Sequence, residues 1–252
     1  MFFRKYEWYS SIKGVILSKH ISKACQDCPS RMDGVFCELE EASLNDLGAN
    51  KITNLYKKGQ TLFVEGNPPF GLYCISTGNV KVSKLGPSGK ENIVRLAGAG
   101  DVLGHRSIFT DQFYSATATA LEDTRVCFID KKYILDKVTK EPTISKNLMF
   151  RLGRDLGLSE NRIASLSQKS VFERTSELLL LLGASHSEET GDGKMITLKL
   201  TREEMASYLG TSSETLIRCI SELKSEKVLG QVGKSLVILD EEKLVEFANL
   251  NY

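Results

Sequence analysis

Histidine, proline and tryptophan are scarce in this sequence. Its 252 residues include 3 histidines, 5 prolines and 1 tryptophan. His20, His105 and His186 are widely separated in sequence, which argues against a histidine-built site of the kind that metal-dependent enzymes use. The sequence also lacks a nucleophile elbow, a P-loop and a glycine-rich dinucleotide turn. We therefore expect a protein that is not an enzyme.

Long apolar runs are missing as well. Lysine and glutamate interrupt the aromatic residues of the N-terminal stretch, so we expect neither a signal peptide nor a membrane span. This indicates a cytoplasmic protein with no membrane partner. Cysteines stay reduced in that compartment, so the 6 cysteines favour a metal site, redox chemistry or core packing over a disulfide framework.

The chain has no large excess of charge of either sign. Its formal net charge is +1, which gives no overall argument for binding nucleic acid. Residues 169–252 hold 10 Lys and Arg against 14 Asp and Glu, a formal charge of −4. DNA binding by this part would depend on local cations and on a second subunit, and would be sensitive to salt. The local cations are Arg218, Lys224, Lys227 and Lys234.

Residues 201–224 predict two short helices joined at a glycine. Thr201 with Glu204, and Thr211 with Glu214, have the spacing of a capping box, which places two helix starts ten residues apart. Gly210 lies between them and supplies the turn. The apolar residues expected to pack against each other are Met205, Ala206, Leu209, Leu216, Ile220 and Leu223. This arrangement is typical of a DNA-reading helix-turn-helix.

The outer face of the second helix is polar and suits a DNA groove. Arginine can donate two hydrogen bonds to guanine, and glutamate can accept one from cytosine. The alternative is that Glu214 and Arg218 form an ordinary surface ion pair at i, i+4. The predicted DNA-binding residues are Thr211, Ser212, Ser213, Glu214, Ile217, Arg218 and, in a hairpin near Gly233, Lys234.

Residues 50–130 consist of short alternating runs separated by glycines, which predicts a small β-roll or barrel enclosing a pocket. One cluster of polar residues falls within this region. His105 and Arg106 in it could bind an anion, although such residues beside a turn are often only surface or hydrogen-bonding groups. The predicted effector-pocket residues are Gly104, His105, Arg106, Ser107, Tyr114, Ser115 and Ala116.

Residues 143–168 carry an apolar stripe at helical spacing, over about seven turns. A homodimer seam explains this stripe, and a core helix within one subunit is the alternative. After a further helix, residues 196–200 (ITLKL) alternate like a strand, and the hairpin near Gly233 completes a winged helix-turn-helix. The predicted fold is α+β. Its domains are an N-terminal cysteine-containing segment (1–44), a β-roll sensor domain (45–140), a dimerisation helix (141–168) and a winged helix-turn-helix domain (169–252).

Three cysteines lie close together near the N-terminus. Cys25 and Cys28 form a C-x-x-C pair, and Cys37 follows nine residues later. Thiolates at this spacing can hold one soft metal centre. Core packing at the N-terminus is the alternative.

Four motifs together resemble the cyclic-AMP receptor/FNR superfamily of bacterial transcription regulators over about residues 45–245. They are the roll motif GxxLFxEGxxxxGLYCIxxGxVKV from Gly59 to Val82, GDVLGHRSI, YSATATALED and LTREEMASYLGTSSETLIRCISEL. The resemblance implies a homodimer that binds a palindromic promoter site and contacts RNA polymerase. It also implies that Glu214 and Arg218 read a G·C pair, and that Ser213 favours an FNR-like TTGA half-site. A ligand-binding module without DNA activity is the alternative.

The resemblance implies two alternative signals for the roll. His105 and Tyr114 stand where cyclic-nucleotide binders of the family have a glutamate and an arginine, and Ser115 is retained. Loss of the cation that neutralises a buried phosphate disfavours cyclic AMP. Cys25, Cys28, Cys37 and Cys127 resemble the four ligands of the FNR [4Fe–4S] cluster, which the resemblance favours slightly. An unidentified ligand or haem is the third alternative.

Overall fold

The computed structural model describes residues 25–250, so the predicted segment 1–44 is described only from Cys25 onward and His20 lies outside it. Within this range the chain forms two compact units that divide at residue 158. We call residues 25–158 the roll unit and residues 159–250 the winged unit. Among the described residues, no helix is both long and apolar enough to cross a membrane.

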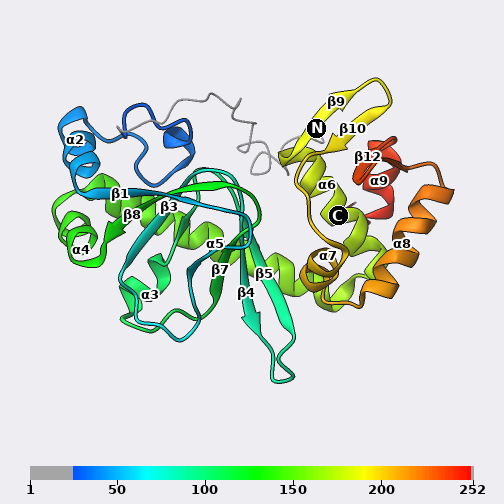
Figure 1. Cartoon of the computed structure of the whole chain (residues 1–252), viewed down its shortest axis with the longest axis horizontal. Coiled ribbons are helices and arrows are strands. Elements are labelled where there is room, and N and C mark those ends of the chain that lie inside the picture. Colours follow the sequence, from blue (N-terminus) through cyan, green and yellow to red (C-terminus); the bar gives the residue numbers. More distant parts are fainter. Residues whose placement is uncertain (1–24, 251–252) are drawn as a thin grey trace. The chain divides into compact units, whose positions relative to one another are not determined.

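Two antiparallel four-stranded sheets form the roll (Figure 1). Their strand orders are β1-β8-β3-β6 and β2-β7-β4-β5. The bounds are β1 Lys51–Tyr56, β2 Thr61–Phe63, β3 Gly71–Thr77, β4 Val80–Leu85, β5 Glu91–Ala97, β6 Val102–Leu103, β7 Thr117–Ala120 and β8 Thr124–Asp130. Strands β2, β3, β4, β5, β7 and β8 fall on the predicted alternating runs, because each run places every second side chain on one face of its sheet. Strands β1 and β6 were not among those runs.

Each face of the β1-β8-β3-β6 sheet belongs to a different core. Tyr73 and Val126 belong to the core inside the roll, whereas Leu72 and Ile129 belong to a second core with the surrounding helices. The helical segments of this unit are η2 Arg31–Asp33, α2 Glu41–Ala49, α3 His105–Thr110, α4 Lys131–Lys140 and the start of α5 Pro142–Gln168. Successive side chains of a strand point to opposite faces, so neighbouring residues of β3 and β8 serve different cores.

The winged unit contains the predicted helix-turn-helix and a four-stranded sheet of order β11-β12-β10-β9. Its elements are α6 Val171–Ser185, β9 Ser187–Thr190, β10 Gly193–Ile196, α7 Arg202–Leu209, α8 Ser213–Ser225, β11 Leu229–Val232, β12 Ser235–Ile238 and α9 Glu241–Phe247. The strand predicted over residues 196–200 was wrong. The strand ends at Ile196, and it pairs with β9 in a hairpin.

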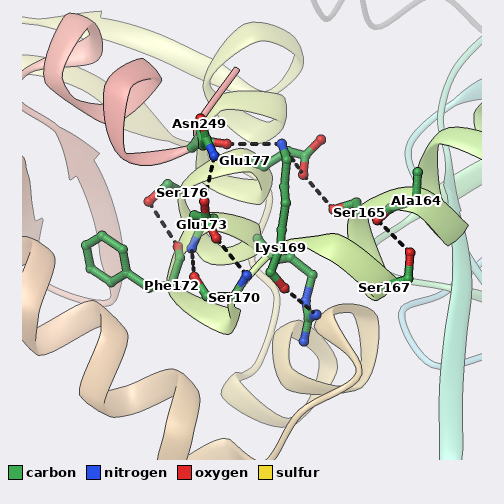
Figure 2. Close-up of polar contacts among 12 residues, drawn as sticks. Ala164, Ser165, Ser167, Lys169, Ser170, Phe172, Glu173, Ser176, Glu177 and Asn249 are labelled. Atoms are coloured by element: carbon green, nitrogen blue, oxygen red, sulfur yellow. Dashed lines mark hydrogen bonds and ion pairs between the residues drawn. The ribbon is translucent and has the colours of Figure 1, made fainter. Parts of the chain in front are cut away.

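The end of α5 is tied into the winged unit by a polar network (Figure 2). Lys169 Nζ lies 3.3 Å from Glu177 Oε2 and donates to the carbonyl of Ala248 at 3.0 Å. Ser165 Oγ donates to the same Glu177 carboxylate at 2.8 Å. Ser170 forms a full capping box at the start of α6. The last turns of α5 are therefore fixed to α6 and to the segment after α9.

Candidate functional site

Helix α8 presents a polar face opposite its buried side. Leu216, Ile220 and Leu223 are buried, whereas Glu214 and Arg218 are exposed. Ile217 lies on the outer face with 49% of its surface exposed. Gly210, which ends α7, has φ +65°, a left-handed conformation that favours glycine at the turn between two helices. The structure therefore brings the predicted reading residues together on one helix.

The start of α8 differs from the prediction by one residue. Ser212 is the N-cap, and its hydroxyl accepts from the backbone N–H of Thr215 at 3.2 Å. The predicted capping box of Thr211 with Glu214 was therefore wrong, because Ser212 supplies the capping oxygen instead. The box of Thr201 with Glu204 is confirmed at the start of α7. Thr211 is half-buried, Ser212 is exposed, Ser213 is half-buried and Lys234 is exposed in the β11–β12 turn.

The apolar stripe of α5 is divided between two roles. Ile144 and Leu148 are buried in the roll unit, as expected of a core helix. Farther along, Met149, Leu156 and Ile163 are 65%, 61% and 66% exposed. These three residues are seven apart, and Leu152 and Leu166 take the intermediate positions. This is the heptad spacing of a two-helix seam.

The predicted effector-pocket residues make contacts with one another and with neighbouring parts of the roll unit. The Tyr114 ring is buried and stacks on Phe63 with ring centroids 4.2 Å apart, and its hydroxyl donates to the carbonyl of Gly71 at 3.2 Å. Arg106 is exposed and donates to the Ser115 hydroxyl.

The remaining predicted pocket residues contact or pack against other parts of the roll unit. Ser107 donates to the carbonyl of Phe113 at 3.2 Å, and Ala116 is buried. A Cβ atom at Gly104 would lie 2.9 Å from the carbonyl oxygen of Gly71. Aromatic side chains of the protein thus occupy the roll interior around Tyr114.

His105 belongs to a cluster of charged side chains that the sequence did not reveal. Its Nε2 lies 3.2 Å from Asp155 Oδ2 on α5. Arg95 Nη1 lies 2.8 Å from the same oxygen, and Arg151 Nε lies 3.0 Å from Asp155 Oδ1. Arg151 also reaches Asp101 Oδ1 at 2.5 Å. The i, i+4 spacing of Arg151 and Asp155 was the only sequence signal of this cluster.

Electrostatics hold the two carboxylates of this cluster in their charged forms. Burial would raise the pKa of Asp155, but the hydrogen bond from His105 and the guanidinium groups of Arg95 and Arg151 lower that pKa below its usual value. The pKa of Asp101 is lowered by Arg95 and Arg151 against the same effect of burial. The cluster therefore fixes the first half of α5 to the roll as a set of paired ions.

A cavity of about 50 Å³ lies on the helix-covered face of the β1-β8-β3-β6 sheet. Three of the four predicted metal ligands, Cys25, Cys28 and Cys127, line it. Cys37 does not line it, since its Sγ lies 3.5 Å from Asn147 Nδ2 on α5. The fourth cysteine in the lining is Cys74, which was not among the predicted metal ligands.

The predicted [4Fe–4S] ligand set therefore fits this structure only in part. Within residues 25–250, no group of three or more His, Cys, Asp or Glu side chains is already arranged to hold a metal ion. The sulfur atoms of Cys25, Cys28 and Cys127 line one cavity but are not spaced to coordinate one metal ion. The fourth predicted ligand, Cys37, lies outside this cavity.

Comparison with known proteins identifies the two units. Residues 53–141 match the cyclic nucleotide-binding domain family, and residues 173–247 match the Crp-like helix-turn-helix domain family. A CRP-like cAMP-activated global transcriptional regulator of Mycobacterium tuberculosis is 30% identical over 85% of this chain and 96% of its own. This chain belongs to the Crp/Fnr superfamily. It is thus a DNA-binding transcription regulator with a cyclic-nucleotide-binding type of sensor domain, and its family is not enzymatic.

Other Crp/Fnr members match over similar lengths. The fumarate and nitrate reduction regulatory protein of Vibrio cholerae is 30% identical over 90% of this chain and 91% of its own. The solved structure of FixK2 from Bradyrhizobium japonicum superposes with a TM-score of 0.71, at 24% identity over 78% of this chain and 96% of that one. The predicted α+β fold with a roll, a long helix and a winged helix-turn-helix is confirmed.

Proposed function

We propose that this protein is a cytoplasmic homodimer that places α8 in the major groove of a palindromic promoter site and acts on RNA polymerase. The exposed Glu214 and Arg218, above the buried Leu216 and Ile220, are the observation that carries the proposal. Arginine can pair with guanine and glutamate with cytosine on one G·C pair. Ser213 beside them favours a TTGA half-site, as the family resemblance of the sequence implies.

A gel-shift assay tests the DNA part. A labelled TTGA-N6-TCAA duplex is mixed with the full-length protein at two salt concentrations, with a scrambled duplex of equal length as control. We expect preferential retardation of the palindrome, weakening steeply as salt rises because phosphate contacts release counterions. No retardation at low salt, with or without a metal or cyclic nucleotide, would contradict the regulator and favour a ligand-binding module.

The proposed dimer forms through the exposed half of the α5 stripe. Met149, Leu156 and Ile163 repeat every seven residues, so two copies of α5 can pack these side chains in a coiled-coil seam. Sedimentation analysis tests this with Leu156→Glu, which should yield monomers. Asn161→Glu adds the same charge to an exposed position outside the stripe and should leave a dimer. A dimer that survives Leu156→Glu would place the seam elsewhere.

We infer that the signal reaches the protein through the thiol-lined cavity of the roll unit. Cys25, Cys28 and Cys127 share this cavity, and thiolates are the natural ligands of iron–sulfur clusters. When bound, such a cluster supplies a redox-active centre. Cyclic AMP is the alternative effector, and the roll's family supports it. The buried, stacked Tyr114 opposes it, because the ring stands where a phosphate-binding arginine is expected.

A further inference from the structure

We propose that Cys74, not Cys37, is the fourth sulfur ligand of a tetrathiolate metal centre with Cys25, Cys28 and Cys127. This rests on the proposed thiol-based sensing and changes the site that carries it. The four cysteines line one cavity on the outer face of the β1-β8-β3-β6 sheet. A donor set of four thiolates suits a single tetrahedral ion such as Zn²⁺, or an iron–sulfur cluster.

Strand pairing places Cys74 beside Cys127. The two residues are direct partners in the antiparallel pairing of β3 with β8. Side chains opposite each other on such strands point to the same face, with Cβ atoms about 5 Å apart. Thr53 of β1 is the partner of Cys127 on the other side, and its Oγ1 lies 3.5 Å from Cys127 Sγ. Two of the sulfur ligands are thus held by the rigid sheet.

The other two ligands come from the segment that covers this face. Cys25 and Cys28 lie on one turn, in which the Cys28 N–H donates to the Cys25 carbonyl at 3.3 Å. Cys28 Sγ lies 3.4 Å from Ser30 Oγ and 3.6 Å from Ser76 Oγ. Hydroxyl groups beside sulfur ligands orient them and tune the metal that they hold. A pair on a turn can shift toward the two fixed sulfurs when a metal binds.

Charge in the cavity also favours a thiolate site. Lys51 lines it, on the same sheet face as Thr53. A lysine ammonium beside four thiolates reduces the negative charge of the loaded site.

Cys37 contacts a residue of α5 outside the cavity. The Asn147 side chain donates to the carbonyls of Val35 and Cys37, both at 3.1 Å, and lies 3.5 Å from Cys37 Sγ. This contact ties the cysteine to α5 rather than to the cavity. The missing ligand is therefore supplied by strand β3, which the C-x-x-C spacing could not indicate.

Differential alkylation of the full-length wild-type protein tests the assignment without any mutation. Anaerobic protein is loaded in one arm with Cd²⁺ and in another with ferrous iron and sulfide, then treated with iodoacetamide and digested for mass spectrometry. We expect protection of Cys25, Cys28, Cys74 and Cys127 relative to unloaded protein, and unchanged labelling of Cys37. Protection of Cys37 together with unchanged labelling of Cys74 would overturn the inference while leaving thiol sensing intact. Failure of both arms to load would overturn both proposals.

Variants give the second measurement. Cys74→Ala should lower bound cadmium, or iron and sulfide, by more than about tenfold, whereas Cys37→Ala should bind as the wild type does. Cys219→Ala removes a buried cysteine of the winged unit and is the matched control. Cys74→Val is a second variant whose apolar side chain fills the same strand position. Thermal unfolding of the metal-free proteins checks that both Cys74 variants are folded. Wild-type loading of both folded Cys74 variants would overturn the inference.

Discussion

One charged cluster of the roll unit and one charged pair of the winged unit differ in burial. In the roll unit, Arg151 and His105 are buried and contact the carboxylate of Asp155. In the winged unit, Glu214 and Arg218 lie exposed on α8. Removal of one member of a buried ion cluster leaves the others without compensation, whereas exposed charges contribute little to stability. The ion cluster around Asp155 thus stabilises one conformation of the roll unit, whereas Glu214 and Arg218 lie on the exposed face of α8 that we propose enters DNA.

The largest effect that would test this contrast is expected from Asp155→Ala. The variant leaves Arg151, Arg95 and His105 without a shared carboxylate, so we expect the free energy of unfolding of the roll unit to fall by about 3–5 kcal/mol. Calorimetry of the full chain measures this. Asp136→Ala breaks an exposed i, i+4 pair with Lys140 and should cost less than about 1 kcal/mol. Equal losses in the two variants would remove the contrast.

Arg218→Ala tests the outward-facing charge. We expect specific affinity for the palindromic duplex to fall by about 1–3 kcal/mol, because a bidentate contact to guanine is lost. The stability of the winged unit should change by less than about 0.5 kcal/mol, since the side chain is exposed. Fluorescence anisotropy measures the affinity. Lys140→Ala removes one exposed positive charge from the roll unit and should leave DNA affinity near that of the wild type.

The sequence was informative where function depends on local spacing. The polar face of α8 follows from helical periodicity within residues 212–221, and the roll strands follow from alternation between glycines. Both features need only neighbouring residues. The N-cap residue of α8 was not predicted correctly, because Thr211 and Ser212 are both good capping residues. Only the backbone conformation decides which side-chain oxygen reaches a backbone amide.

Two features of the roll unit escaped prediction because their residues are far apart in sequence. His105 meets Asp155 fifty residues away, and Cys74 meets Cys127 only through the pairing of β3 with β8. A shift of one residue in that pairing would turn one cysteine to the other face of the sheet. No spacing rule supplies this register. The family resemblance pointed to Cys37, since it follows the C-x-x-C pair in sequence.

The stability of the two units is also expected to respond differently to acid. Burial lowers the pKa of His186 in the winged unit to about 4. The unfolded chain, with a histidine pKa of about 6.5, binds a proton below that pH while the folded unit does not. Stability of the winged unit should therefore fall as pH drops below about 6.5, by about 1–2 kcal/mol at pH 5. Calorimetry at pH 7 and pH 5 measures this loss, and His186→Gln should abolish it.

The roll unit should keep its carboxylate contribution over the same range. The pKa values of Asp101 and Asp155 lie below the usual value for aspartate, so their stabilisation is complete above about pH 4 and is lost only as pH falls through the lowered values. As the pH falls, we expect the unfolding temperature of the winged unit to decrease before that of the roll unit. If the roll transition shifted at pH 5 by as much as the winged one, these carboxylates would not be held in the charged form that their partners imply.

The smallest expected effect compares the two helix starts of the reading motif. Thr201 accepts from the Glu204 amide in a reciprocal capping box, so Thr201→Ala should lower the stability of the winged unit by about 1 kcal/mol. Ser212→Ala should have a similar effect, because Ser212 caps α8. Thr211→Ala is the matched control and should cost less than about 0.5 kcal/mol. Calorimetry of the three variants decides the order. A loss at Thr211 equal to that at Ser212 would restore Thr211 as the cap that the spacing first predicted.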